Sequence, residues 1–205
     1  MKSVVKLENG DMLENYVKKI LSSRVYELAQ ETPLTPAPLL SRRLGPQVFL
    51  KREDLQPVYS FKLRGAYNKI SKLLDAQKAA GVITASAGNH AQGVAMAAKH
   101  LGIKAIIVMG RNTPSIKVNA VKDRGAKVIL HGDNYDQASV HAKELCKEQG
   151  LTFIPPYDDA EVIAGQGTIG LEIVNQHNGP IDAIFIPVGG GGLLAGVAAY
   201  VKHLH

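Results

Sequence analysis

Lys62 stands in the run Ser60-Phe61-Lys62-Leu63-Arg64-Gly65-Ala66, at the predicted start of a helix. A lysine forms an imine with a carbonyl compound only as the neutral amine, so this chemistry needs a lowered pKa. The N-terminus of a helix disfavours a nearby cation and helps to lower that pKa. Ser60 can cap the helix, and Phe61 can shield an imine from water. A solvated lysine in the first turn explains the same spacing, so both interpretations stay open on this motif alone.

A second polar motif, Thr84-Ala85-Ser86-Ala87-Gly88-Asn89-His90, lies between a predicted strand and a predicted helix. Parallel sheets bind ligands at the carboxyl ends of their strands, and backbone N–H groups at a helix start point toward anions. A carboxylate group is a natural ligand there, and the Asn89 amide is free to hydrogen-bond a ring oxygen. The alternative is an Asn/Gly turn that only caps the helix.

Four consecutive glycines follow an apolar segment, residues 181–188, that is predicted as a strand: Gly189, Gly190, Gly191 and Gly192. Without Cβ atoms they let backbone amides approach a phosphate group, and the helix predicted after them directs its dipole at it. The Gly-x-Gly-x-x-Ala spacing over 190–195 fits a dinucleotide fingerprint only loosely. Close packing of a helix on a strand is the structural alternative.

Along the chain the three motifs supply, in this order, an amine, a polar loop for a ligand and a glycine loop for a phosphate group. Together they are what a protein needs to hold pyridoxal 5′-phosphate (PLP) through an imine on a lysine. The interpretation is therefore an enzyme that acts on an amino acid. A nucleotide-binding α/β module is a competing class, and it rests only on the glycines.

The composition indicates a globular protein without a nucleic-acid or membrane partner. The 205 residues are 45% hydrophobic, and 24 Lys and Arg against 18 Asp and Glu give a net charge of +6. These basic residues are scattered, whereas surfaces that track phosphates cluster them with aromatic residues. The longest apolar stretches, such as residues 105–109, fall far short of the roughly 20 residues that a membrane-spanning helix needs. The single cysteine, Cys146, excludes an internal disulfide and favours the cytoplasm.

Alternating segments predict an α/β fold. Strands are expected over 81–85, 105–109, 126–130 and 152–154, with helices over 89–101, 115–124 and 135–148 between them. This alternation predicts right-handed crossovers and open parallel sheets with helices on both faces.

The segments outside this alternation predict a second lobe. A helix capped by Asp11 is expected near the N-terminus, followed by a break at Pro33, Pro36 and Pro38, a short strand over 48–51 and a helix over 162–176. Pro155-Pro156 indicates a crossing between lobes. We expect a smaller lobe, residues 75–160, and a larger lobe made of residues 1–74 and 161–205.

The motifs resemble those of the fold-type II PLP enzymes, and among them the threonine dehydratases of the biosynthetic type. The resemblance extends from about Arg24 across nearly the whole chain and includes Lys51-Arg52-Glu53-Asp54 and His131-Gly132-Asp133-Asn134. Ala87 stands where the related serine racemases carry a second serine, which disfavours racemisation. His90 and the four glycines argue against cysteine synthases, which also resemble this fold.

Roles for individual residues follow from this resemblance. Lys62 holds PLP and later removes the substrate Cα proton, with Phe61 beside it. Asn89 bonds the 3′-oxygen of the cofactor, and its phosphate group is bound by Gly189, Gly190, Gly191, Gly192 and Leu193. The substrate carboxylate is taken by a loop of three residues: Ser86, Gly88 and His90. No metal is expected.

The resemblance implies deamination of L-threonine, and of L-serine, to 2-oxobutyrate or pyruvate and ammonia. The family's chains run considerably further and form homo-oligomers, so we expect a fragment whose larger lobe has an unfinished sheet with an exposed apolar edge. The alternative is a PLP-binding remnant without catalysis.

Overall fold

The computed structural model describes residues 9–204. Its α-helices are α1 (Asn9–Leu21), α2 (Pro38–Leu44), α3 (Lys62–Ser71), α4 (Asp75–Ala80), α5 (Asn89–His100), α6 (Ser115–Lys122), α7 (Tyr135–Glu148), α8 (Ala160–Gln176) and α9 (Gly192–Leu204). Its strands are β1 (Leu34–Pro36), β2 (Phe49–Lys51), β3 (Val82–Ala85), β4 (Ala105–Met109), β5 (Lys127–Leu130) and β6 (Thr152–Phe153). Two short 3₁₀ turns, η1 (Val25–Glu27) and η2 (Glu53–Leu55), complete the order.

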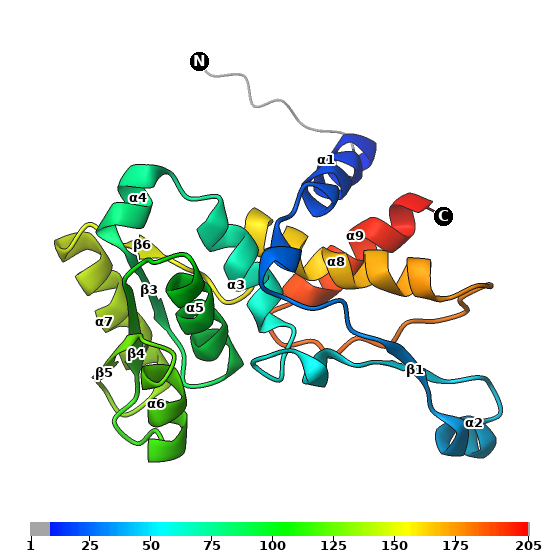
Figure 1. Cartoon of the computed structure of the whole chain (residues 1–205), viewed down its shortest axis with the longest axis horizontal. Helices are drawn as coiled ribbons and strands as arrows, with labels where there is room; N and C mark the ends of the chain where they lie inside the picture. The colour runs from blue at the N-terminus through cyan, green and yellow to red at the C-terminus, as the bar shows by residue number, and fades with distance from the viewer. Residues whose placement is uncertain (1–8, 205) are drawn as a thin grey trace.

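The central feature is a parallel sheet with strand order β5-β4-β3-β6. Side chains of successive strand residues point to opposite faces. Ile107 of β4 therefore packs in a core with α5 and α6, whereas its neighbour Val108 packs in a second core with α7. Figure 1 shows the sheet between these helices. Burial on both faces explains why the central strands β3 and β4 read as nearly continuous apolar runs, and the predicted α/β class is confirmed.

A group of helices, α1, α3, α8 and α9, lies beside this sheet lobe in Figure 1. Val17 and Ile20 of α1 pack in one cluster with Ala164 of α8 and Tyr200 of α9. Gly196 of α9 allows α8 and α9 to approach closely, since a Cβ at this position would lie only 2.7 Å from a backbone nitrogen of α8. The division of the chain into lobes at residues 75 and 160 stays a prediction.

The proline-rich segment differs from its prediction as a simple break. Residues 34–36 form β1, which pairs antiparallel with β2 in the register Leu34↔Lys51. Helix α2 begins at Pro38, because proline is tolerated in the first turn, where its missing N–H is not needed. Two prolines thus stand within elements instead of separating them.

Two predicted features are wrong. Helix α1 begins at Asn9, so Asp11 lies in its first turn and is not its cap. Residues 181–188 form no strand, because a strand exists only through pairing and this segment has no partner among residues 9–204. Ile184 and Ile186 pack against α8 and α9, while Phe185 between them is 95% exposed. The predicted parallel sheet of the larger lobe is therefore not formed in the part of the chain that the structure describes.

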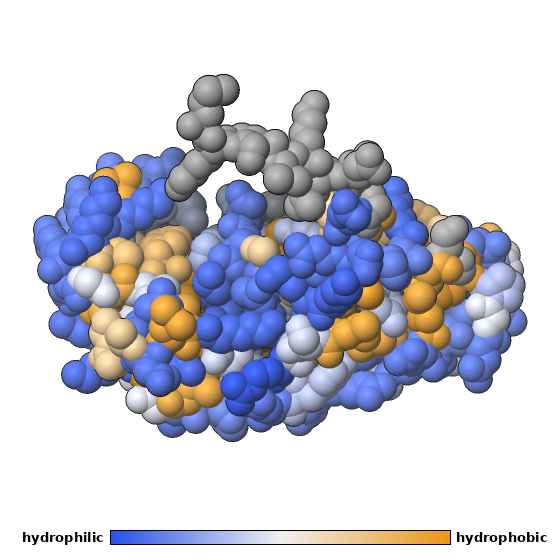
Figure 2. Space-filling model, turned by 90° about the horizontal axis from the view of Figure 1, so that it is seen from above, coloured by the Kyte–Doolittle hydropathy of each residue, from blue (hydrophilic) through white to orange (hydrophobic). Residues whose placement is uncertain are grey.

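Exposed apolar side chains gather on the helical half of the molecule, outside the sheet lobe. Figure 2 shows hydrophobic residues at the surface of the half that contains α1, α8 and α9 in Figure 1. Val188 and Leu194, on either side of the glycines, are 61% and 41% exposed. Within the described residues, no helix is both long and apolar enough to span a membrane.

Candidate active site

Lys62 is the first residue of α3, and its amine lies between the helices and the segment that leaves the sheet. Its backbone N–H donates to the Ser60 hydroxyl at 3.3 Å, but Phe61 occupies the N-cap position and no side chain caps the helix, so the predicted cap by Ser60 is wrong. Its Nζ donates to the Pro156 carbonyl at 2.6 Å and lies 5.4 Å from the centroid of the Phe61 ring. Burial lowers the pKa of the Lys62 amine, as imine chemistry requires.

Two glycines let neighbouring helices approach the backbone beside Lys62. A Cβ at Gly93 of α5 would lie 3.2 Å from the Lys62 carbonyl, and a Cβ at Gly165 of α8 would lie 2.7 Å from the Arg64 carbonyl. Helix α3 is thus held between α5 and α8.

Arg64, two residues after Lys62, is fully buried in an ionic network. It makes a bidentate pair with Glu53, at 2.8 and 2.7 Å, and a second pair with Glu172 of α8. Lys51 approaches Glu172 at 2.5 Å, so two cations face two carboxylates. Burial would raise the pKa of Glu172, but Arg64 and then Lys51 outweigh it and lower that pKa. The network ties the first turn of α3 to β2, η2 and α8.

The asparagine motif forms a turn at the carboxyl end of β3. The Ser86 hydroxyl accepts the Gly88 N–H at 3.2 Å, and Asn89 begins α5 with an exposed side chain. A cavity of 270 Å³ opens beside this turn, and Ser86, Asn112 and Asn134 are among its lining residues. The turn therefore presents polar groups at the edge of the sheet where ligands are expected.

His90 points into the core and not toward the cavity. It is 3% exposed, and its Nε2 lies 3.0 Å from the Ile154 carbonyl, which also accepts from Thr84 at 2.8 Å. Because a carbonyl only accepts, Nε2 carries the proton. Nδ1 is buried without a hydrogen-bond partner in residues 9–204. Burial lowers the pKa of His90 to about 4, so the ring is neutral near pH 7.

The glycine loop has two different sides. Cβ atoms at Gly189 and Gly191 would meet nothing within 4 Å among the described residues. A Cβ at Gly190 would overlap the ring of Tyr157, and one at Gly192 would lie 2.7 Å from the Tyr157 carbonyl. Gly191 has φ +85°, in the left-handed region that favours glycine. Two of the glycines therefore pack against Tyr157, and the other two leave open space on their Cβ side. Binding of a phosphate group at the open side stays a prediction.

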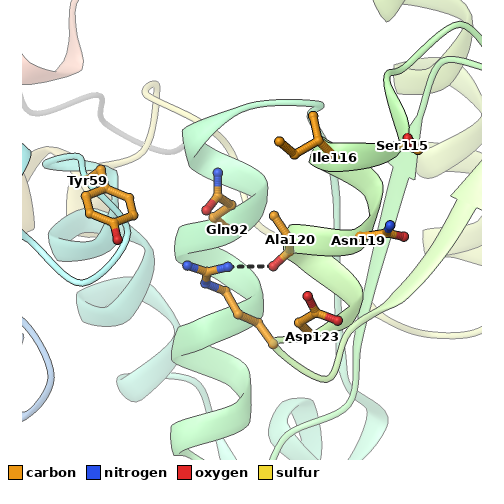
Figure 3. A pocket seen from close by; sticks show the side chains of 8 residues that line it. Tyr59, Gln92, Ser115, Ile116, Asn119, Ala120 and Asp123 are labelled. Carbon is orange, nitrogen blue, oxygen red and sulfur yellow. Dashed lines mark hydrogen bonds between the residues drawn. The ribbon is translucent and has the colours of Figure 1, made fainter.

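Sequence reasoning missed Tyr157, Glu53 and Glu172. Glu172 carried a signal, because it is a carboxylate in an otherwise apolar stretch of α8. It also missed a surface groove of 540 Å³ between Tyr59, α5 and α6 (Figure 3). Arg124 lies at this groove and donates to the Ala120 carbonyl at 2.6 Å.

The residues fit PLP on three counts. The Lys62 amine has a lowered pKa. The open side of Gly189 and Gly191 leaves room for a phosphate group at the start of α9. The exposed Asn89 is available to a ring oxygen at the start of α5.

The fold and this site define a class of enzymes. Residues 25–205 match the family described as pyridoxal-phosphate dependent enzyme, and the chain belongs to that family. It is 60% identical over 199 residues to the biosynthetic chloroplastic threonine dehydratase of Arabidopsis thaliana. It is also 60% identical over 189 residues to the biosynthetic L-threonine dehydratase of Pasteurella multocida. The resemblance found in the motifs is thus confirmed.

A solved structure shows the same fold. The processed form of threonine deaminase isoform 2 from Solanum lycopersicum has a TM-score of 0.93 and 54% identity, and the match covers 96% of this chain and 57% of that one. The matches to the Arabidopsis and Pasteurella relatives cover 96% and 92% of this chain but only 34% and 37% of theirs. The chain therefore spans about a third of the length of these curated relatives.

Proposed function

We propose that this chain carries the cofactor and substrate sites of a PLP-dependent threonine ammonia-lyase of isoleucine biosynthesis. One observation carries the proposal. The half-buried Lys62 amine, with its lowered pKa, contacts Pro156, and the next residue packs on the glycine loop. The reaction takes L-threonine to 2-oxobutyrate and ammonia, and L-serine to pyruvate and ammonia. The names and identity of the relatives support this substrate class.

Lys62 has two tasks in this reaction. Its neutral Nζ would hold the cofactor covalently, and as the free amine it would accept the Cα proton of the substrate. The bound PLP supplies an electron sink for the charge left at Cα. Phe61, half-buried beside Nζ, excludes water from this amine.

The polar turn after β3 orients the substrate. Ser86, which lines the 270 Å³ cavity, and Gly88, whose N–H donates to the Ser86 hydroxyl, form the turn that takes the substrate carboxylate. The buried ring of His90 contributes by fixing the turn to Ile154 and not by direct contact. Asn89 holds the ring oxygen of the cofactor. Gly189, Gly190, Gly191, Gly192 and Leu193 hold its phosphate group.

Covalent loading tests the cofactor site directly. The chain is incubated with PLP, reduced with borohydride and mapped by peptide mass spectrometry. A single pyridoxyl group on Lys62, absent in Lys62→Ala and retained in Lys69→Ala, supports the proposal. Lys69 is the matched control, because it lies on the same helix but pairs with Asp159. Label spread over surface lysines contradicts it.

Turnover tests the reaction. Release of 2-oxobutyrate from threonine, abolished in Lys62→Ala, supports the lyase. Loading on Lys62 without product supports the alternative of a PLP-binding remnant. A homo-oligomer and a cytoplasmic location remain parts of the proposal, and the name of the Arabidopsis relative places that protein in the chloroplast.

A further inference from the structure

We propose that Tyr157 is a positioning residue for the glycine loop. Its ring and backbone hold one side of the loop, so that the amides on the open side stay directed at the phosphate group of the cofactor. The inference rests on the proposed cofactor site and adds a residue that belongs to none of the three motifs.

The contacts between Tyr157 and the loop fall on alternate glycines. The ring occupies the position that a Cβ of Gly190 would take, and the Tyr157 carbonyl and Cα lie 2.7 and 3.1 Å from that of Gly192. Gly189 and Gly191 have no described neighbour within 4 Å on their Cβ side. One side of the loop is therefore packed on Tyr157, and the other side is left for a ligand.

Tyr157 is itself held in place from the sheet lobe. Three residues earlier, Ile154 donates to the Ile83 carbonyl at 2.9 Å and accepts from Thr84 and His90. The two prolines between Ile154 and Tyr157 restrict the backbone further. Because only two residues separate Ile154 from Tyr157, the anchoring of Ile154 to β3 also fixes where Tyr157 contacts the glycine loop.

The same short segment also meets the reactive lysine. The Pro156 carbonyl accepts from the Lys62 amine at 2.6 Å, one residue before Tyr157. Residues 154–157 thus fix the distance between the amine and the loop. A cofactor that is held at its aldehyde by Lys62 and at its phosphate group by the loop requires that distance to be constant.

The ring of Tyr157 makes the contact, because the atoms nearest to the Gly190 position are Cγ, Cδ1 and Cδ2. Tyr157→Phe is therefore the conservative variant, and Tyr157→Ala removes the support. Tyr157 is 41% exposed, so both variants are expected to fold. The readout is equilibrium binding of PLP compared with pyridoxal, which has the aldehyde but no phosphate group.

We expect Tyr157→Ala to weaken PLP binding about tenfold, through poorer amide hydrogen bonds to a charged group, and to leave pyridoxal binding unchanged. Tyr157→Phe should bind both like the wild type. A merely structural role would weaken both ligands together, and that result, or no change in either, would overturn the inference.

A double-mutant cycle provides a second test that depends on the contact itself. Gly190→Ala should weaken PLP binding in the wild type, because its Cβ displaces the loop from the Tyr157 ring, and should add little in the Tyr157→Ala background. Gly189→Ala, the matched control, adds its Cβ on the open side, so its effect should be additive with Tyr157→Ala. Additive effects for Gly190→Ala as well would refute the contact.

The two proposals fail in different ways. A wild-type chain that loads PLP on Lys62, combined with an unaffected Tyr157→Ala variant, overturns only the role of Tyr157. A wild-type chain that takes up no PLP on Lys62 overturns the cofactor site and, with it, the role of Tyr157.

Discussion

The Nζ of Lys62 donates a hydrogen bond of 2.6 Å to the Pro156 carbonyl, which is 94 residues away in the sequence. The amine is half-buried, and burial lowers its pKa from the ordinary value of 10.5. The contact joins the start of α3 to the segment that leaves the sheet lobe. The amine is therefore held next to the proposed cofactor site.

The pH dependence of PLP loading follows from this burial. Only the neutral amine reacts, so the loading rate should rise with pH, with a midpoint below the 10.5 of an ordinary lysine. The measurement is the rate of pyridoxyl incorporation into the Lys62 peptide over a pH series. Free Nα-acetyl-lysine is the reference amine. A midpoint equal to that of the reference would show that burial does not activate Lys62.

The neutral ring of His90 predicts a loss of stability in acid. Its pKa in the folded state is about 4, against 6.5 for an ordinary histidine, so below pH 6.5 the unfolded chain binds a proton that the folded chain does not. This contribution is complete above pH 6.5 and is lost as the pH falls toward 4. At about 1.4 kcal/mol per pH unit, its upper limit is about 3.5 kcal/mol.

Urea unfolding of the wild type and of His90→Gln, at about pH 7 and about pH 4, measures this contribution. The glutamine can still donate to Ile154 but does not titrate, so the variant should lose less stability on acidification. His203→Gln, at an exposed position on α9, should behave like the wild type. Equal acid losses in wild type and His90→Gln would rule out a buried neutral His90.

The central strands of the sheet lobe, β3 and β4, were predictable because both of their faces are buried. Residues such as Ile107 and Val108 then form continuous apolar runs, which helices regularly separate. Residues 181–188 also form a nearly continuous apolar run and were therefore predicted as a strand. A strand needs a pairing partner as well, and a local sequence pattern does not show whether one is present. Helix α2 was missed because Pro38 was interpreted as a breaker, although proline is favoured at a helix start.

The residues of the candidate site likewise fall into those with a local sequence signal and those without one. Lys62, Asn89 and the glycines form contiguous motifs and were found from their spacing. Tyr157 has no local signal, because its role depends on a contact with the loop more than 30 residues later. The roles assigned to individual residues remain predictions.

The ion pair between Arg64 and Glu172 predicts a large stability effect. Glu172→Gln leaves the fully buried Arg64 paired with Glu53 alone and removes the carboxylate that pairs with Lys51. Breaking a buried pair by removing one partner costs about 3 to 5 kcal/mol. We expect a fall of that size in the free energy of unfolding, measured in urea.

Glu14→Gln is the control for this prediction. Glu14 forms an exposed pair with Lys18, so its substitution should change the urea midpoint little. Since the network anchors the first turn of α3, Glu172→Gln should also slow loading of Lys62. Unchanged unfolding and loading together would show that the network does not hold α3.

Two glycines near the site predict opposite behaviour on substitution by alanine. A Cβ at Gly165 would lie 2.7 Å from the backbone of both Arg64 and Gly65, so Gly165→Ala must push α8 away from α3. We expect a loss of about 1 to 3 kcal/mol in unfolding free energy, measured in urea, and poorer loading of Lys62. Gly88 has φ −130°, and its Cβ would meet nothing within 4 Å in the described part of the chain.

Gly88→Ala should therefore keep the stability of the wild type and still load PLP on Lys62. The added methyl group lies in the turn proposed to bind the substrate carboxylate, so binding of L-threonine to the loaded chain should weaken. Spectroscopic titration with threonine, together with urea unfolding of both variants, checks the contrast. If Gly88→Ala binds threonine as the wild type does, the substrate carboxylate does not bind at this turn. If Gly165→Ala is as stable as the wild type, α3 and α8 are not held in the close contact observed.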